Sequence, residues 1–200
     1  AAGALVHVGT VQLEKGLGPR HLVFHPTLRV AYVINELRSS VSVLKYQPRK
    51  EASRAAMPAA GAAPGAPAAV PVEHAVHDAR ATLRHVQTLS TLPDNFECRD
   101  HHKSHASEIR VHPSGRWLYV ANRGHDSIAV YAVACAGEPS HAGDSVDSVA
   151  AFDARAGDGT LTCVQICSTL GAFPRNFNFD ATGRWLVVGN QNDNELRVFA

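Results

Sequence analysis

Charged side chains recur at matched positions of this sequence of 200 residues. Arg20 and Arg175 each follow a proline at the start of a short apolar segment, and Glu36, Arg123 and Gln191 each follow an asparagine at the end of one. A guanidinium donates paired hydrogen bonds to carboxylates and phosphates, and a carboxylate can accept a proton from a reacting group. Three guanidiniums beside one carboxylate would therefore bind an anionic substrate and supply one candidate base.

These positions match because the sequence repeats. Three units share an apolar segment, a turn, a β-branched and aromatic segment ending in asparagine, and a third, alternating segment; the asparagines are Asn35, Asn122 and Asn190. Such segments between turn signals are typical of strands. A fourth strand is predicted at residues 83–89 and 161–166, and residues 5–11 have the pattern of the same outer strand. Tandem units of four antiparallel strands are typical of β-propeller blades.

The sequence therefore predicts an all-β protein, an incomplete β-propeller ring with about three four-stranded antiparallel blades. The expected parts are an outer strand at residues 1–14, a blade at 18–90, a second blade at 105–168 and a partial blade at 173–200. Two insertions lengthen the blades: a disordered segment rich in alanine and proline at 48–80, and a glycine- and serine-rich segment at 137–158. Closed propellers have about four to eight blades, so we expect a fragment of a longer propeller.

The predicted blades place the recurring charges at one rim. The two inner strands of a blade are antiparallel, so the start of the first and the end of the second lie together near the axis. We expect five side chains to converge on this central mouth: Arg20, Glu36, Arg123, Arg175 and Gln191. His21 follows Arg20 and is expected to contact substrate there. An alternative interpretation is that these charges pair between blades and only hold the blades together.

The other polar residues are interpreted structurally. The three repeat asparagines are expected to cap turns, and His25 and His112, each before a proline, are expected to be structural. His101, His102, His105 and Glu108 are residue types that bind metals, but a lysine interrupts the run, so we predict a solvated loop. Glu108 is expected to pair with Arg110 or Arg123. No metal and no other cofactor is predicted.

Composition excludes several classes of protein. The sequence is 45% hydrophobic and 18% charged with a net charge of +1, which excludes a disordered chain and predicts no nucleic-acid or membrane partner. It has no glycine-rich phosphate loop and no serine-hydrolase or zinc-protease motif. The four cysteines, at positions 98, 135, 163 and 167, form no CxxC pair and are interpreted as reduced thiols of a cytoplasmic protein.

The sequence resembles the lactonase-type seven-bladed propellers, a family that includes the propeller form of 6-phosphogluconolactonase and the carboxy-muconate lactonizing enzyme. Five stretches carry the resemblance: residues 18–26, 32–36, 107–116, 121–128 and 173–177. The resemblance implies a pocket that uses the arginine of the Gly-Pro-Arg-His motif, the glutamate after Asn35 and the arginine of the Asn-Arg-Gly motif. Here these are Arg20, Glu36 and Arg123. The family also places a histidine on an earlier blade.

The resemblance implies a hydrolase acting on a sugar lactone, with 6-phospho-D-glucono-1,5-lactone as the expected substrate and 6-phosphogluconate, of the pentose phosphate pathway, as product. Arg20, Arg123 and Arg175 would hold the phosphate or the oxyanion, and Glu36 would activate water without a metal. The expected partners are this small anionic lactone and the remaining blades of the parent chain. The alternatives are an isomerase that opens or closes a muconolactone, a non-catalytic propeller that binds other proteins, and a metal-dependent gluconolactonase.

Overall fold

The computed structural model describes residue 7 and residues 9–47, 82–96, 104–135 and 157–200, and nearly all regular structure in these ranges is β-strand. The strands are β1 (Pro19–Phe24), β2 (Val30–Asn35), β3 (Ser40–Gln47), β4 (Thr82–Ser90), β5 (His105–Val111), β6 (Trp117–Arg123), β7 (Ser127–Val133), β8 (Leu161–Ser168), β9 (Pro174–Phe179), β10 (Leu186–Asn190) and β11 (Glu195–Phe199). Helical structure in these ranges is limited to one 3-10 turn, η1 (Glu36–Arg38).

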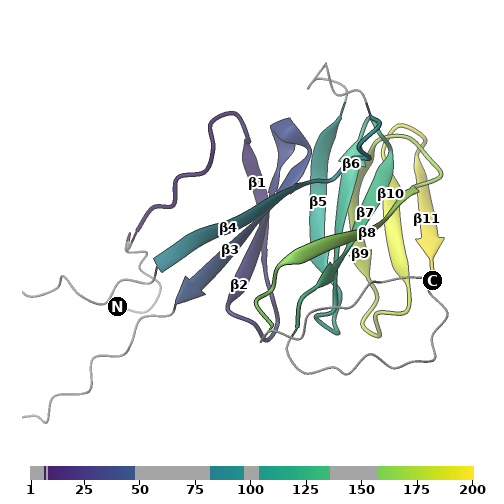
Figure 1. Ribbon diagram of the computed structural model, residues 1–200. Coiled ribbons are helices and arrows are strands. Elements are labelled where there is room, and N and C mark those ends of the chain that lie inside the picture. The colour runs from purple at the N-terminus through teal and green to yellow at the C-terminus, as the bar shows by residue number, and fades with distance from the viewer. Residues whose placement is uncertain (1–6, 8, 48–81, 97–103, 136–156) are drawn as a thin grey trace, which may run out of the picture.

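The strands form three antiparallel sheets that follow one another along the chain. β1–β4 and β5–β8 make four-stranded sheets and β9–β11 a three-stranded one, each with its strands hydrogen-bonded in sequence order. Figure 1 shows the sheets side by side, from the first in purple and blue to the third in yellow. The first strands β1, β5 and β9 contact one another in turn. The predicted propeller blades in an incomplete ring are confirmed.

The hydrophobic core lies between neighbouring sheets. β2 is buried along its whole length, and its Tyr32 and Ile34 share a cluster with Ile109 and Leu118 of the second sheet. Phe177 of the third sheet, 1% exposed, packs in a second cluster against the opposite face of the second sheet. Burying a large apolar side chain stabilises the fold by about 1.5–3 kcal/mol. The second sheet is therefore packed on both faces, which holds the three first strands in fixed relative positions.

Two histidines form hydrogen bonds between neighbouring blades at the rim opposite the predicted mouth. His25 Nε2 lies 2.8 Å from the carbonyl oxygen of Gly115, and His112 Nε2 lies 3.1 Å from that of Gly183. Both glycines have φ of +74°, a conformation that other residues rarely adopt, and their turns close the first hairpins of the second and third blades. The predicted structural role of His25 and His112 is confirmed, and their partner is the neighbouring blade.

The predicted outer strand at residues 1–14 is wrong in the part that can be seen. Residues 7 and 9–14 form no strand, and Val11 and Leu13 instead pack against the Ala31, Val33 and Leu44 cluster of the first sheet. A strand needs a hydrogen-bonded neighbour, and among the described residues this segment is paired with none of the three sheets. Apolar packing on the face of the first sheet takes the place of strand pairing.

Three further predictions concern the insertions, the cysteines and membranes. The insertion at 48–80 and most of the insertion at 137–158 lie outside the described residues. At the described end of the second insertion, Asp158 Oδ2 lies 3.5 Å from Lys45 Nζ of the first blade. Cys135, Cys163 and Cys167 are free thiols, as predicted, and Cys98 lies outside the described residues. Where the structure is described, no helix is long and apolar enough to cross a membrane.

Candidate active site

The first strand of every blade is irregular at the same place, near the predicted mouth. In β5, Ala106 and Glu108 pair with consecutive residues of β6, so Ser107 is an inserted residue. Arg175 is inserted in the same way in β9, and Arg20 lies at the matching position of the irregular part of β1. A bulge of this kind re-aims side chains and is common beside functional sites. It directs neighbouring side chains of the first strands toward the adjoining blade.

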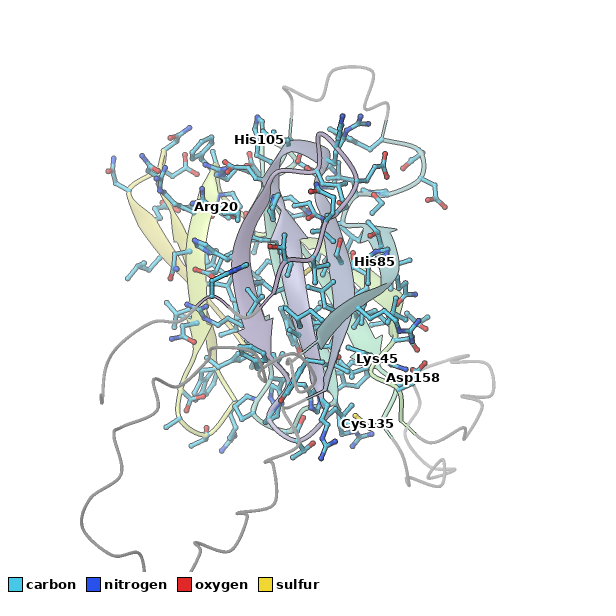
Figure 2. The ribbon with its side chains drawn as sticks, turned by 90° about the vertical axis from the view of Figure 1, so that its left-hand side faces the viewer. Arg20, Lys45, His85, His105, Cys135 and Asp158 are labelled. Atoms are coloured by element: carbon cyan, nitrogen blue, oxygen red, sulfur yellow. The ribbon has the colours of Figure 1, made fainter. Side chains whose placement is uncertain are left out.

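Arg20 and Arg123 bind one shared carboxylate. Arg20 Nη1 donates to Glu36 Oε2 at 3.1 Å, and its Nε donates to the carbonyl of Ser107 at 3.2 Å. Arg123 Nη2, from the second blade, donates to Glu36 Oε1. The structure thus brings together three of the five residues predicted at the mouth, and it joins them by ion pairs across the junction of two blades. Figure 2 shows Arg20 toward the end of the molecule opposite Lys45, Asp158 and Cys135.

Arg123 is the most enclosed member of this group. It is 8% exposed, and its guanidinium carbon lies 5.4 Å from the centre of the Phe173 ring, within cation–π range. Its Nε is buried and has no acceptor among the described residues. Glu36 therefore supplies the only carboxylate paired with this guanidinium in the described part of the chain. Phe173, which the sequence did not single out, covers the guanidinium of Arg123 from the start of the third blade.

Glu36 stays ionised in this setting. Burial, the largest single influence, raises the pKa of its carboxyl, but hydrogen bonds from Arg123 and Arg20 and their positive charges outweigh it, so the pKa lies below the usual value. A carboxylate held in this way accepts a proton less readily than a free one. Glu36 is well suited to orient the two guanidiniums, and the pairing weakens it as the base that the sequence suggested.

The third blade contributes a separate pair. Arg175 Nη1 donates to Gln191 Oε1 at 3.3 Å, and both side chains are exposed. Within the described residues, neither makes a hydrogen bond or ion pair to Arg20, Glu36 or Arg123. The five predicted residues therefore form two groups on neighbouring blades.

A second row of contacts lies one residue further along the first strands. His21 Nδ1 is 3.2 Å from Glu108 Oε1, and Asn176 Nδ2 donates to Glu108 Oε2. Glu108 also pairs with Arg110 Nη1 at 2.9 Å, so the expected pairing with Arg110 is confirmed and that with Arg123 is not observed. The sequence placed His21 at the mouth but gave no sign of its link to Glu108.

The predicted solvated loop at residues 101–105 is wrong at its last residue. His105 begins β5, pairs in register with Arg123, and has a buried Nδ1 without a partner among the described residues. Figure 2 shows it toward the same end of the molecule as Arg20. His101 and His102 lie outside the described residues, and within the described ranges no group of three His, Cys, Asp or Glu residues could hold a metal ion.

The repeat asparagines link backbone segments at the ends of the second strands. Asn35 Nδ2 donates to the hydroxyls of Ser40 and Ser42 at 3.0 and 2.9 Å. Asn122 Nδ2 donates to the carbonyl of Thr91 at 2.7 Å, in the segment that leads from the preceding blade. These roles are structural, but the predicted turn capping is not observed for Asn35, which makes no side-chain capping hydrogen bond at η1. Asn122 instead stabilises the connection between two blades.

The comparisons with known proteins agree with this architecture. A family model described as lactonase, seven-bladed beta-propeller, matches residues 1–77, 68–146 and 139–200. A 6-phosphogluconolactonase of Bacillus subtilis is 32% identical over 98% of this chain and 41% of its own length. The crystal structure of a Lactobacillus plantarum protein superposes with a TM-score of 0.67 at 28% identity, covering 100% of this chain and 42% of that one.

A second solved structure is also similar. A periplasmic gluconolactonase of Pseudomonas aeruginosa superposes with a TM-score of 0.62 at 29% identity, over 95% of this chain and 37% of that one. The chain spans about two fifths of the length of the curated relatives that it matches, between 39% and 42% for five of them.

Proposed function

The chain belongs to the lactonase family of seven-bladed β-propellers, and from this premise we propose that its mouth belongs to a site that hydrolyses a lactone. The proposed substrate is a sugar lactone with an anionic group, 6-phospho-D-glucono-1,5-lactone, and the product is 6-phosphogluconate. Relatives with the names 6-phosphogluconolactonase and gluconolactonase support this choice. The proposed reaction uses no metal.

The observation that carries the proposal is the pair of guanidiniums on Glu36. Two arginines from different blades converge on one carboxylate at the rim, so their charges lie close together and exceed that of Glu36 by one. Guanidiniums fixed in this way are suited to bind a phosphate or to stabilise the oxyanion that forms when water adds to an ester carbonyl. Arg20 is the candidate for substrate contact because its side chain is 26% exposed, whereas that of Arg123 is 9% exposed.

Arg175 and Gln191 are proposed to contact a more distant part of the substrate. They hold the matching positions of the third blade and are exposed. Because they are not tied to Glu36, a substrate group can approach them without breaking an ion pair between blades. Their proposed role is to bind hydroxyl or phosphate oxygens and not to take part in bond breaking.

The test compares Arg20→Lys with Arg84→Lys in the protein at its full natural length. Lysine keeps the charge at position 20 but lacks the planar guanidinium that donates paired hydrogen bonds. We expect kcat/KM for the phosphorylated lactone to fall by at least about tenfold, which corresponds to the loss of one charge-assisted hydrogen bond. Arg84 is exposed on the outer strand β4 and serves as the matched control. Hydrolysis is followed above the spontaneous rate, with a chelator and with a muconolactone as further arms.

The outcomes separate the functions. Hydrolysis that survives the chelator and falls only in Arg20→Lys supports the proposal. Loss of activity with the chelator would point to a metal-dependent lactonase, and turnover of the muconolactone alone would point to an isomerase. No turnover of either compound by the wild-type protein would refute the proposal and leave a binding role for the propeller.

A further inference from the structure

The row His21, Glu108 and Asn176 has no part in the function proposed so far. The three residues hold equivalent positions on β1, β5 and β9, and Glu108 receives hydrogen bonds from both neighbours. It is the only carboxylate among these three positions, and it lies at the junction of all three first strands. The row therefore places the buried carboxylate of Glu108 beside the mouth. Burying a charge is costly unless it is paired, so its position there requires an explanation.

Glu108 is buried and fully engaged. Its side chain is 3% exposed, and besides His21 and Asn176 it accepts hydrogen bonds from the backbone N–H of Ile109 at 3.0 Å and from Arg110 Nη1 at 2.9 Å. An ionised carboxylate only accepts hydrogen bonds, so four donors satisfy it without leaving it free to move. The carboxylate is therefore a fixed acceptor for the imidazole of His21.

This contact determines which nitrogen of His21 carries the proton. Because Glu108 can only accept, His21 Nδ1 must donate, and in the neutral ring Nε2 is then the nitrogen with the free lone pair. Nε2 has no hydrogen-bond partner among the described residues. The His21 side chain is 43% exposed and that of Glu108 is 3% exposed, so one end of the pair is anchored and the other is open.

His21 is also in the right place relative to the anion-binding arginine. It directly follows Arg20 in the irregular part of β1, and the two side chains contact consecutive residues of β5, Ser107 and Glu108. A water molecule beside His21 would therefore lie near a lactone held by Arg20. Glu36, the other candidate base, has both oxygens occupied by guanidiniums.

We propose that His21, oriented by Glu108, is the general base that activates the attacking water; this inference rests on the proposed lactone hydrolysis. His21 Nε2 takes a proton from water as the water oxygen bonds to the carbonyl carbon, and the oxyanion is held by Arg20. When the intermediate collapses, the bond between the carbonyl carbon and the ring oxygen breaks, and the imidazolium returns its proton to the departing ring oxygen. The new carboxylic acid then loses its proton to solvent. His21 is a catalytic residue in this scheme, and Glu108 is a positioning residue.

The charges around His21 set the direction of its pH response. The elements packed against β1 are β2, β5 and η1. β2 carries no Asp, Glu, Lys, Arg or His, and the other charged or titratable groups on β1, η1 and β5 are Arg20, Glu36, Arg38, His105, Glu108 and Arg110. Of these groups, Glu108 is hydrogen-bonded to the ring of His21. Removing its negative charge disfavours the imidazolium, so a variant without it should hold an unprotonated ring to lower pH.

The experiment measures pH profiles of kcat/KM for the phosphorylated lactone in the full-length protein and in His21→Gln, Glu108→Gln and His85→Gln. His85 is exposed on β4, and among the described residues its ring is hydrogen-bonded to Thr88, which makes it the matched control. We expect the wild-type activity to fall at acidic pH, and we expect His21→Gln to lose both about 10²–10⁴-fold in rate and that pH dependence. Glu108→Gln should move that acidic fall to lower pH, and His85→Gln should change neither.

A second measurement tests the pair without catalysis. Nitrogen-15 NMR of the His21 ring should show the proton on Nδ1 in the wild type and a shift toward Nε2 in Glu108→Gln. If Glu108→Gln does not fold, the His21→Gln profile and the wild-type tautomer still decide the question. An active wild type with unchanged His21→Gln activity, or with the His21 proton on Nε2, would overturn the assignment. A wild type without lactone hydrolysis would instead refute the proposed function.

Discussion

Gly115→Ala should destabilise the protein by breaking the tie between the first and second blades. At φ of +74°, an alanine costs about 1–2 kcal/mol in backbone strain alone. A Cβ on Gly115 would lie 2.9 Å from His25 Cε1 and 3.0 Å from His25 Nε2, so the imidazole must move away. His25 is 4% exposed, and loss of its 2.8 Å contact to the Gly115 carbonyl leaves a buried polar atom unpaired, which costs about 1–3 kcal/mol.

The two contributions together predict about 2–5 kcal/mol of lost stability. For a protein of this size, each kcal/mol lowers Tm by about 2–4 °C, so thermal unfolding followed by circular dichroism should show a drop of roughly 4–20 °C. Gly16→Ala is the matched control, because Gly16 has φ of +86° but its Cβ would meet nothing closer than 3.8 Å. It should lose only the strain of about 1–2 kcal/mol.

A double variant identifies the cause of the difference. In a His25→Ala background the clash with Gly115→Ala disappears, so the added cost of the alanine should shrink to that of Gly16→Ala. Equal Tm losses for Gly115→Ala and Gly16→Ala in the wild-type background would refute the reasoning. They would show that the contact between His25 and Gly115 does not hold the blades together.

Two further predictions concern the core and the ion pairs at the mouth. Phe177→Ala removes a ring that is 1% exposed and should cost about 3–5 kcal/mol, seen as a lower midpoint of urea unfolding; a change below about 1 kcal/mol would mean that the third blade packs loosely. Because the pKa of Glu36 is lowered by Arg123 and Arg20, its ion pairs stabilise the folded state above the ordinary glutamate pKa, and this contribution is lost as pH falls through the lowered value. The urea midpoints of wild type and Glu36→Gln should therefore converge as the pH is lowered from about 6 to below 4. A constant difference between the two midpoints would show that the arginines do not lower the pKa of Glu36.

The repeat predicts that Arg20, Glu36 and Arg123 lie close together. The sequence does not decide whether these charges pair with one another or bind a substrate. Register within a blade follows from strand alternation and turn position, so it locates each side chain along the axis. The charges of the site also pair with one another, as the alternative interpretation expected, and this leaves Glu36 orienting arginines. Arg175 and Gln191 share the register, and among the described residues their side chains are hydrogen-bonded to each other, because the third blade has Gln191 where the first has Glu36.

The contact of His21 with Glu108 could not be predicted from the sequence. The sequence predicts His21 at the mouth and pairs Glu108 with Arg110 or Arg123. His21 and Glu108 lie in strands of different blades, and whether they meet depends on the rotation between sheets and on the bulge in each first strand. Residues 7 and 9–14 show the opposite error: their strand-like pattern forms no strand, and Val11 and Leu13 pack on the face of the first sheet instead.

The sequence by itself determined the blade pattern, the three-unit register and the rim that carries the charges, because alternation and turns are local properties of the chain. Only the tertiary structure decided which charges pair, how deeply Glu108 is buried and which nitrogen of His21 faces outward. Those properties depend on distances between blades, and such distances are set by the packing of whole sheets and not by any short segment.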